Sequence, residues 1–147
     1  MAVRMELSRI LIRELNDCQI IELREAPSNG AAPEGDQNGD GRRAFPIVIG
    51  LPEAQAIERR IKGMTIKRPQ THDLLAQVIQ TLGGELKSIT ITDLAEGTFF
   101  ATLDVLKEGG LLHIDSRPSD AIALGVANDV PIYVEEHVLD AAVSEEG

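Results

Sequence analysis

The sequence predicts an α+β fold in which about seven strands form a mixed or antiparallel sheet and four helices pack against it. Three observations predict this fold. Seven short apolar runs are bounded by Gly, Pro, Asn or Asp, which is typical of strands. Four other stretches carry apolar residues three or four positions apart, which is typical of helices with one buried face. The runs on either side of residues 95–97, Ala-Glu-Gly, have the spacing of a β-hairpin.

Three strands are expected before the first helix, at residues 4–14, 18–25 and 44–49. Pro46 restricts the third of them to a sheet edge or to the beginning of the strand, because proline cannot donate a hydrogen bond to a ladder. Residues 27–43 are rich in Gly, Pro, Asn and Asp, and they predict a long flexible loop. A helix then begins near Pro52, whose missing N–H suits a first helical position, and ends at Gly63.

A second helix is expected from about Thr71 to Leu82, because apolar residues recur along it at helical spacing. Thr71 is its expected N-cap, and Gly83-Gly84 its expected stop. Four further strands are expected, at residues 86–94, 98–106, 111–115 and 131–134. Gly97 is expected to adopt a positive φ in the hairpin turn between the first two of these.

The helix from Pro118 to Ala127 is apolar nearly all round and rich in small residues. Small side chains let another backbone approach closely, so this helix is expected to be central and buried. A last helix is expected from about Glu135 to Ala142, followed by a frayed tail at 143–147.

The whole-chain properties indicate one domain, residues 1–147. The chain has a single cysteine, Cys18, so it cannot form an internal disulfide, which fits a reducing compartment. It has no run of about 18 apolar residues and no apolar core of a signal peptide. We therefore expect a cytoplasmic protein that does not interact with a membrane.

The charge of the chain is distributed unevenly. Its net charge of −10 argues against a general attraction to nucleic acid. Residues 42–70, however, carry seven basic and two acidic side chains. Arginines and lysines of this segment could line a track for phosphates, or they could simply form a solvated helix face.

One group of polar residues surrounds the start of the helix at Pro118. It consists of Asp115, Arg117, Ser119 and Asp120. Two carboxylates can hold a divalent cation, and an arginine can grip a phosphate with two hydrogen bonds. The alternative is structural: Asp120 caps its own helix, and Arg117 pairs with Asp115 at the corner between strand and helix.

A second group surrounds the start of the helix at Thr71. It consists of Arg68, Thr71, His72 and Asp73. A helix start beside basic residues can bind phosphate, and a histidine can act as a general base near neutral pH. The alternative is again structural, with Thr71 as a cap, Asp73 at the positive end of the helix dipole and His72 exposed.

Five segments of the chain together resemble the bifunctional nuclease (BFN) domain, over about Met5 to Ala142. They read IGLPEAQAI, RPQTHDLL, LAEGTFFATL, IDSRPSDAIAL and PIYVEE in chain order. The resemblance implies a compact α+β domain that self-associates into a homo-oligomer. It also implies a nuclease activity on DNA and RNA, best supported for plant members of the family.

Together, the two motifs and the resemblance lead to a hypothesis of phosphodiester hydrolysis in one cleft. In both motifs an Arg-Pro precedes an acidic helix start. Catalysis is assigned to His72, Asp73, Asp115 and Asp120, and substrate binding to Arg68, Thr71, Arg117 and Ser119. Asp73, Asp115 and Asp120 are assigned to a divalent metal, Mg²⁺ or Mn²⁺, which would lower the pKa of a bound water. The alternative is a non-catalytic module for binding or oligomerisation with the same fold.

Overall fold

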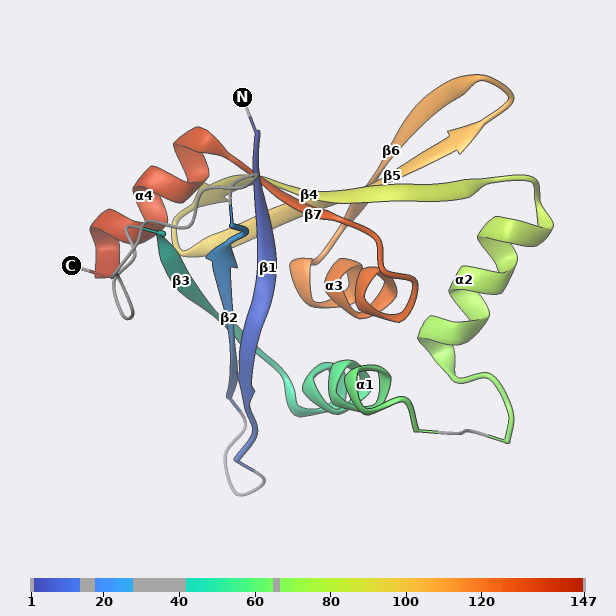
Figure 1. The fold of residues 1–147 in the computed structure, drawn as a ribbon, viewed down its shortest axis with the longest axis horizontal. Coiled ribbons are helices and arrows are strands. Elements are labelled where there is room, and N and C mark those ends of the chain that lie inside the picture. Colours follow the sequence, from blue (N-terminus) through green and yellow to red (C-terminus); the bar gives the residue numbers. More distant parts are fainter. Residues whose placement is uncertain (1, 14–17, 28–41, 65–66, 147) are drawn as a thin grey trace.

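The computed structural model describes residues 2–13, 18–27, 42–64 and 67–146. They form a seven-stranded mixed sheet in the order β3-β2-β1-β7-β4-β5-β6, with four helices packed around it (Figure 1). The strands are β1 (Ala2–Leu11), β2 (Gln19–Glu25), β3 (Ala44–Ile49), β4 (Glu85–Ala95), β5 (Thr98–Lys107), β6 (Gly110–Ser116) and β7 (Ile132–Glu135). The helices are α1 (Leu51–Lys62), α2 (Thr71–Thr81), α3 (Pro118–Ala127) and α4 (Glu136–Glu146). This arrangement confirms the predicted fold class.

The sheet is strongly twisted. In Figure 1, β1, β2 and β3 run across the direction of β4 and β5. β7 joins the two halves, because it pairs antiparallel with β1 and parallel with β4. The curvature brings the edge strand β3 close to the start of β5, where the rings of Phe45 and Phe99 stack with their centroids 5.5 Å apart. As predicted from Pro46, β3 is an edge strand.

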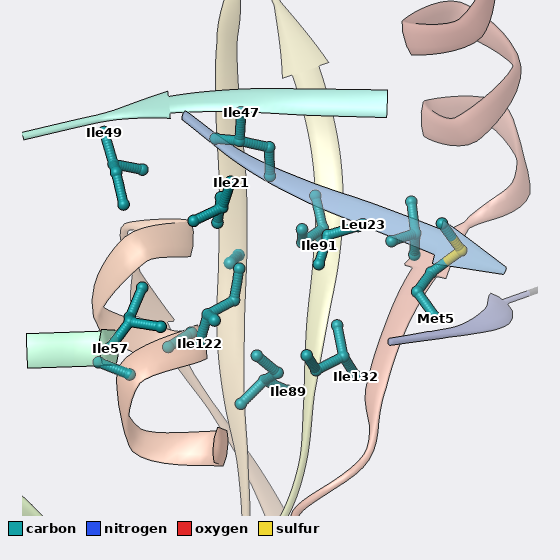
Figure 2. Packing of buried hydrophobic residues seen from close by; sticks show 14 of the residues in the cluster. Met5, Ile21, Leu23, Ile47, Ile49, Ile57, Ile89, Ile91, Ile122 and Ile132 are labelled. Atoms are coloured by element: carbon teal, nitrogen blue, oxygen red, sulfur yellow. The ribbon is translucent and has the colours of Figure 1, made fainter. Parts of the chain in front are cut away.

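The core is built mainly from aliphatic side chains, as the low aromatic content of 3% requires. Figure 2 shows isoleucines from the sheet meeting those of α1 and α3, with Ile122 lying between Ile57 and Ile89. The side chains of α3 from Ala121 to Leu124 are all almost fully buried. The prediction of a central buried helix is therefore confirmed.

Two tight turns shape the half of the sheet that ends in β6. Glu96 and Gly97 join β4 to β5, and Glu108 and Gly109 join β5 to β6, all four with positive φ. Two successive positive φ values define the turn whose twist matches that of a β-hairpin. The expected conformation of Gly97 is confirmed. In Figure 1 the β5–β6 turn projects away from the helices at the upper right.

The structure also corrects details of the prediction. The N-cap of α2 is Gln70 rather than Thr71, because the Asp73 carboxylate accepts a hydrogen bond from the Gln70 backbone N–H, 3.0 Å away. α4 continues past the expected end at Ala142 to Glu146. The expected flexible loop at 27–43 lies almost entirely outside the described residues. No helix within the described ranges is both long and apolar enough to span a membrane.

Candidate functional site

A cavity of about 750 Å³ lies where the first turns of α1, α2 and α3 meet the end of β6. Its apolar wall includes Leu75 and Ile79 of α2, Leu103 of β5 and Ile114 of β6. Its polar wall is formed by Glu53, Arg59, Gln70, Thr71, His72, Ser116, Arg117 and Asp120. Apolar walls with a few convergent polar groups are typical of ligand-binding sites.

His72 and Asp120 meet at this cavity from two different helices. His72 is in the first turn of α2, and Asp120 is in the first turn of α3. Their side chains are in direct contact, with His72 Nε2 2.9 Å from Asp120 Oδ1. Two motifs that are far apart in the sequence therefore converge, as the Arg-Pro pattern predicted.

Arg117 holds the same carboxylate from the other side. Its Nε donates to Asp120 Oδ2 at 2.9 Å, and its Nη2 lies 3.2 Å from Asp120 Oδ1. Nη2 also lies 3.3 Å from the Glu53 carboxylate in the first turn of α1. The guanidinium is mostly exposed, with 65% of the side chain accessible, so it remains open to a ligand.

These contacts keep Asp120 ionised. Burial raises the pKa of the Asp120 carboxyl, but hydrogen bonds from Arg117 and His72 lower it more, so the net pKa lies below its usual value. The partner carboxylate in turn raises the pKa of Arg117.

The ionised state of Asp120 determines which nitrogen of His72 is protonated. A carboxylate can only accept hydrogen bonds, so Nε2 of His72 must carry the proton and donate. In the neutral ring, Nδ1 then keeps its lone pair. Among the residues that the structure describes, none donates or accepts a hydrogen bond at Nδ1. His72 therefore has one nitrogen fixed by a carboxylate and one available to accept a proton.

The other members of the two predicted groups lie in different places. Thr71 lines the cavity. Arg68 is exposed and does not line it, and the buried Ser119 borders a different hollow beside β3. Asp115 borders the cavity, but side chains alternate along a strand, so its carboxylate points to the opposite face of the sheet from Ile114.

Asp73 is also directed away from the cavity. One carboxylate oxygen accepts from the Gln70 backbone, and the other lies 2.6 Å from Arg60 Nη2. The Arg60 side chain is only 8% exposed. Asp73 therefore lies in the first turn of α2 at the positive end of the helix dipole, as the structural alternative proposed, and it also takes part in the cap and anchors α2 to α1.

Comparison with known proteins identifies the family of the chain. Residues 36–146 match the family described as "Bifunctional nuclease domain". The chain belongs to this family. The family match begins at residue 36, later than the resemblance from Met5 suggested, so β1 and β2 lie before it.

Relatives of this BFN chain include bacterial and plant proteins. An uncharacterized protein of Mycobacterium tuberculosis (strain H37Rv) is 45% identical over 107 residues, which cover 73% of this chain and 62% of the relative. A protein named bifunctional nuclease 1 from Arabidopsis thaliana is 26% identical over 69% of this chain and 32% of the relative. Bifunctional nuclease 1 of Oryza sativa subsp. japonica is 21% identical, covering 84% of this chain and 38% of the relative. The chain thus spans less than two thirds of the length of these relatives.

The predicted metal ligands of this BFN chain are not gathered in one place. Within the described ranges, no group of three or more His, Cys, Asp or Glu side chains is close enough to hold a metal ion. Asp73 is held by Arg60 and does not line the cavity, and the Asp120 carboxylate is held by His72 and Arg117. The three carboxylates therefore do not fit a shared ion, although a need for Mg²⁺ or Mn²⁺ remains a prediction.

The basic segment at 42–70 is dispersed in the fold. Arg43 lies 2.7 Å from Glu136, and it also contacts Glu25 and Asp140, none of which lines the cavity. Arg60 is buried against Asp73. Of this segment's cations, Arg59 lines the cavity, where it donates to the Gln70 side chain. Arg60 is therefore held by a carboxylate, and a phosphate track along Arg59, Lys62, Lys67 and Arg68 stays a prediction.

A second pair of histidine and aspartate lies on the sheet face opposite to the cavity. Asp104 on β5 is almost fully buried and accepts hydrogen bonds from His113 Nδ1, 2.8 Å away, and from three hydroxyl groups. The hydroxyls belong to Ser88, Thr90 and Thr102, at 2.7–2.9 Å. Sequence reasoning placed His113 in the sheet but missed Asp104. The available signal was the alternation of polar residues with apolar ones along β4 and β5.

Proposed function

We propose that this chain hydrolyses phosphodiester bonds in DNA and RNA at the cavity between α1, α2 and α3. The observation that carries the proposal is the contact between His72, Asp120 and Arg117 on one wall of that cavity. Membership of the BFN family and the names of the plant relatives support the same reaction. Cytoplasmic localisation is part of the proposal.

The arrangement can supply base catalysis and charge stabilisation. Nδ1 of His72 accepts a proton from a water molecule, whose oxygen then attacks the phosphorus. The bond from phosphorus to the leaving sugar oxygen breaks, and that oxygen takes a proton from the imidazolium or from solvent. Asp120 stabilises the imidazolium, and Arg117 stabilises the negative charge that builds on the phosphate oxygens. No step is assigned to a metal, because the described carboxylates do not fit one.

The test is cleavage of labelled single-stranded DNA and RNA by the parent protein and by His72→Ala. We expect the substitution to lower the cleavage rate by about 100-fold or more, which is the usual contribution of a general base. Assays with EDTA, Mg²⁺ and Mn²⁺ establish whether an ion is required. His137→Gln is the matched control, because His137 is an exposed histidine on α4 that does not line the cavity.

Two results would contradict the proposal. One is a purified parent protein that cleaves neither nucleic acid with any of these ions. The other is His72→Ala cleaving as fast as the parent and His137→Gln.

A second candidate function is a module for binding or assembly that performs no chemistry. The observation that favours it is the surface of α2, which has no buried residue. Large apolar side chains on this helix are 38–68% exposed, namely Leu74, Leu75, Val78 and, just after its last turn, Leu82. Exposed apolar patches of this kind mark interaction sites. Self-association as a homo-oligomer is part of both candidates.

Thermal melting distinguishes the second candidate from the first. If the chain is a module that performs no chemistry, His72→Ala and Asp120→Asn should lower the melting temperature. Oligonucleotides, EDTA and Mn²⁺ should leave it unchanged. A melting temperature that rises with oligonucleotide in the parent but not in His72→Ala would exclude a module for assembly alone and favour a nucleic-acid site at the cavity, and the cleavage assay then separates binding from catalysis.

A further inference from the structure

A second hollow adjoins the cavity at Arg117, which lines both of them. Its volume is about 590 Å³, within the range of roughly 300–1,000 Å³ that is usual for ligand pockets. We call it the β3 hollow. Its wall is formed mainly by residues 46–50 at the end of β3, by Phe99 of β5, and by Arg117, Pro118 and Ser119 at the start of α3.

The β3 hollow differs from the cavity in its charge. The cavity is bordered by three carboxylates, those of Glu53, Asp115 and Asp120. Among the described residues that line the β3 hollow, none is acidic, and Arg117 is the one cation. Most of the remaining wall is apolar, with Phe99 and the side chains of β3. A ligand with a negative charge at one end and an apolar surface at the other therefore matches this wall.

The hydroxyl of Ser119 has no partner within the protein. The residue is 6% exposed. Among the residues that the structure describes, none forms a hydrogen bond with Ser119 Oγ. In that same part of the chain, every buried side-chain oxygen or nitrogen that is cut off from solvent does have a partner. The Ser119 hydroxyl is therefore open to the β3 hollow, which Ser119 borders.

The start of α3 adds two backbone donors beside this hydroxyl. The first N–H groups of a helix have no partner within it, and Pro118 has no N–H. Ser119 and Asp120 therefore carry the first two N–H groups of α3, and no described residue accepts a hydrogen bond from either. The positive end of the helix dipole favours an anion at this position.

The same helix start serves both hollows. The Asp120 side chain contacts His72 in the cavity, whereas Ser119 borders the β3 hollow. Arg117 lies between them, with Nε and Nη2 held by the carboxylates of Asp120 and Glu53. Among the residues that the structure describes, none accepts a hydrogen bond from its Nη1. A ligand that extends from one hollow to the other therefore passes a cation with free donors.

We propose that the β3 hollow binds the nucleotide next to the one whose phosphodiester bond is cleaved. The phosphate of this neighbouring nucleotide accepts hydrogen bonds from the Ser119 hydroxyl and the first N–H groups of α3. Its sugar or base packs against Phe99 and the side chains of β3. The identity of the ligand rests on the proposed hydrolysis, whereas the site itself rests on the hollow, the hydroxyl and the helix start.

Cys18 allows the occupancy of the hollow to be measured without any cleavage. It lines the β3 hollow, it is exposed, and it is the only cysteine of the chain. Its rate of alkylation by iodoacetamide, a small neutral reagent, therefore reports whether the hollow is filled. The probes are AMP and dAMP, which have a phosphate but no phosphodiester bond. At constant ionic strength, we expect both to slow alkylation several-fold at saturation, and adenosine at the same concentration to have no effect.

Ser119→Ala tests which group holds the phosphate. We expect the concentration of AMP that gives half-maximal protection to rise about tenfold or more, because a hydrogen bond to a charged group is lost. Ser8→Ala is the matched control, because Ser8 is an exposed serine of β1 that lines neither hollow, and it should protect like the parent. Circular dichroism shows whether each variant keeps its fold, and the comparison of AMP with adenosine in the parent needs no variant.

Three results would overturn this proposal. They are no protection by AMP or dAMP, equal protection by adenosine or by inorganic phosphate, and a folded Ser119→Ala that AMP protects as well as it protects the parent. Failure here is distinct from failure of the hydrolysis. A parent that cleaves nucleic acid without protection of Cys18 loses only the β3 site, and one that is protected without cleaving keeps the site and loses the hydrolysis.

Discussion

Among the residues that the structure describes, two histidine–aspartate pairs joined by a hydrogen bond lie on opposite faces of the sheet, and they are built differently. Asp104 is 4% exposed and is surrounded by three hydroxyls and His113. Asp120 is 29% exposed, and its hydrogen-bond donors are His72 and an exposed arginine. In the first pair the carboxylate is inaccessible and the histidine is exposed. In the second, both groups line a cavity with room for a ligand.

The comparison shows that the contact between histidine and carboxylate does not by itself indicate a catalytic site. Both contacts are short, and both carboxyl groups have a lowered pKa because their hydrogen bonds outweigh the effect of burial. The difference lies in the other donors. Three hydroxyls tie Asp104 into the sheet, whereas Arg117 carries a charge that can also contact a phosphate.

Replacing each of the two aspartates with asparagine should give the largest difference between the two pairs, and it should appear in the cleavage rate. Asp120→Asn should lower cleavage of DNA or RNA by about 100-fold or more, because the amide no longer stabilises the imidazolium of His72. Asp104→Asn should leave the rate within about twofold of the parent under conditions where it is folded. Initial rates at saturating substrate measure both. Equal losses of rate in the two variants would show that the cavity is not the catalytic centre.

Replacing the same two aspartates with alanine should affect stability in the opposite order, with the larger loss at Asp104. Asp104→Ala leaves three hydroxyls and His113 without their acceptor, and we expect it to lower the free energy of unfolding by about 3 kcal/mol. Asp120→Ala should cost about 1 kcal/mol, because Asp120 is itself partly exposed and its partner Arg117 can be solvated. Urea denaturation followed by circular dichroism measures both values. A larger loss for Asp120→Ala would contradict the structural role given to Asp104.

The stabilising effect of Asp104 should depend on pH in a definite direction. Its pKa in the folded protein is below the ordinary value of 3.8, so the ionised carboxylate stabilises the fold above that pH. This contribution is lost as the pH falls through the lowered pKa. The difference in unfolding free energy between the parent and Asp104→Asn should therefore be largest near pH 6–7 and shrink below about pH 4. Urea titrations at several pH values measure it, and a constant difference would contradict the assignment.

Much of the fold could be predicted because it depends on local patterns. The apolar runs predicted seven strands, and the small-residue pattern from Pro118 to Ala127 predicted a buried helix. Boundaries were less predictable. Thr71 has the usual chemistry of an N-cap, but the extended backbone of Gln70 and its bond to Asp73 place the cap one residue earlier.

The site could be predicted only in part, because partners are chosen by tertiary packing. The repeated Arg-Pro before an acidic helix start predicted that His72 and Asp120 would converge. It did not show that Asp73 would turn to Arg60, since that contact depends on how α1 packs beside α2. The alternation of polar and apolar residues marked Asp104 as lying on the polar face of β5, but it could not give its partners, because three of its four donors come from β4 and β6, whose register the sequence does not specify.

The smallest expected effect is a difference in unfolding free energy between two threonine variants of β4. One threonine donates to Asp104, and the other lies two residues further along the strand. Thr90 donates to the buried carboxylate at 2.7 Å, whereas Thr92 lies 3.4 Å from an exposed backbone carbonyl. Thr→Val keeps the shape and strand propensity of each residue, so the two variants differ mainly in the lost hydrogen bond. We expect Thr90→Val to lower the free energy of unfolding by about 1–2 kcal/mol and Thr92→Val to change it by less than about 0.5 kcal/mol. Urea denaturation of the two variants side by side measures this difference. Similar values would mean that the hydroxyls around Asp104 are replaceable by water, and that this pair is less distinct from the cavity pair than its burial indicates.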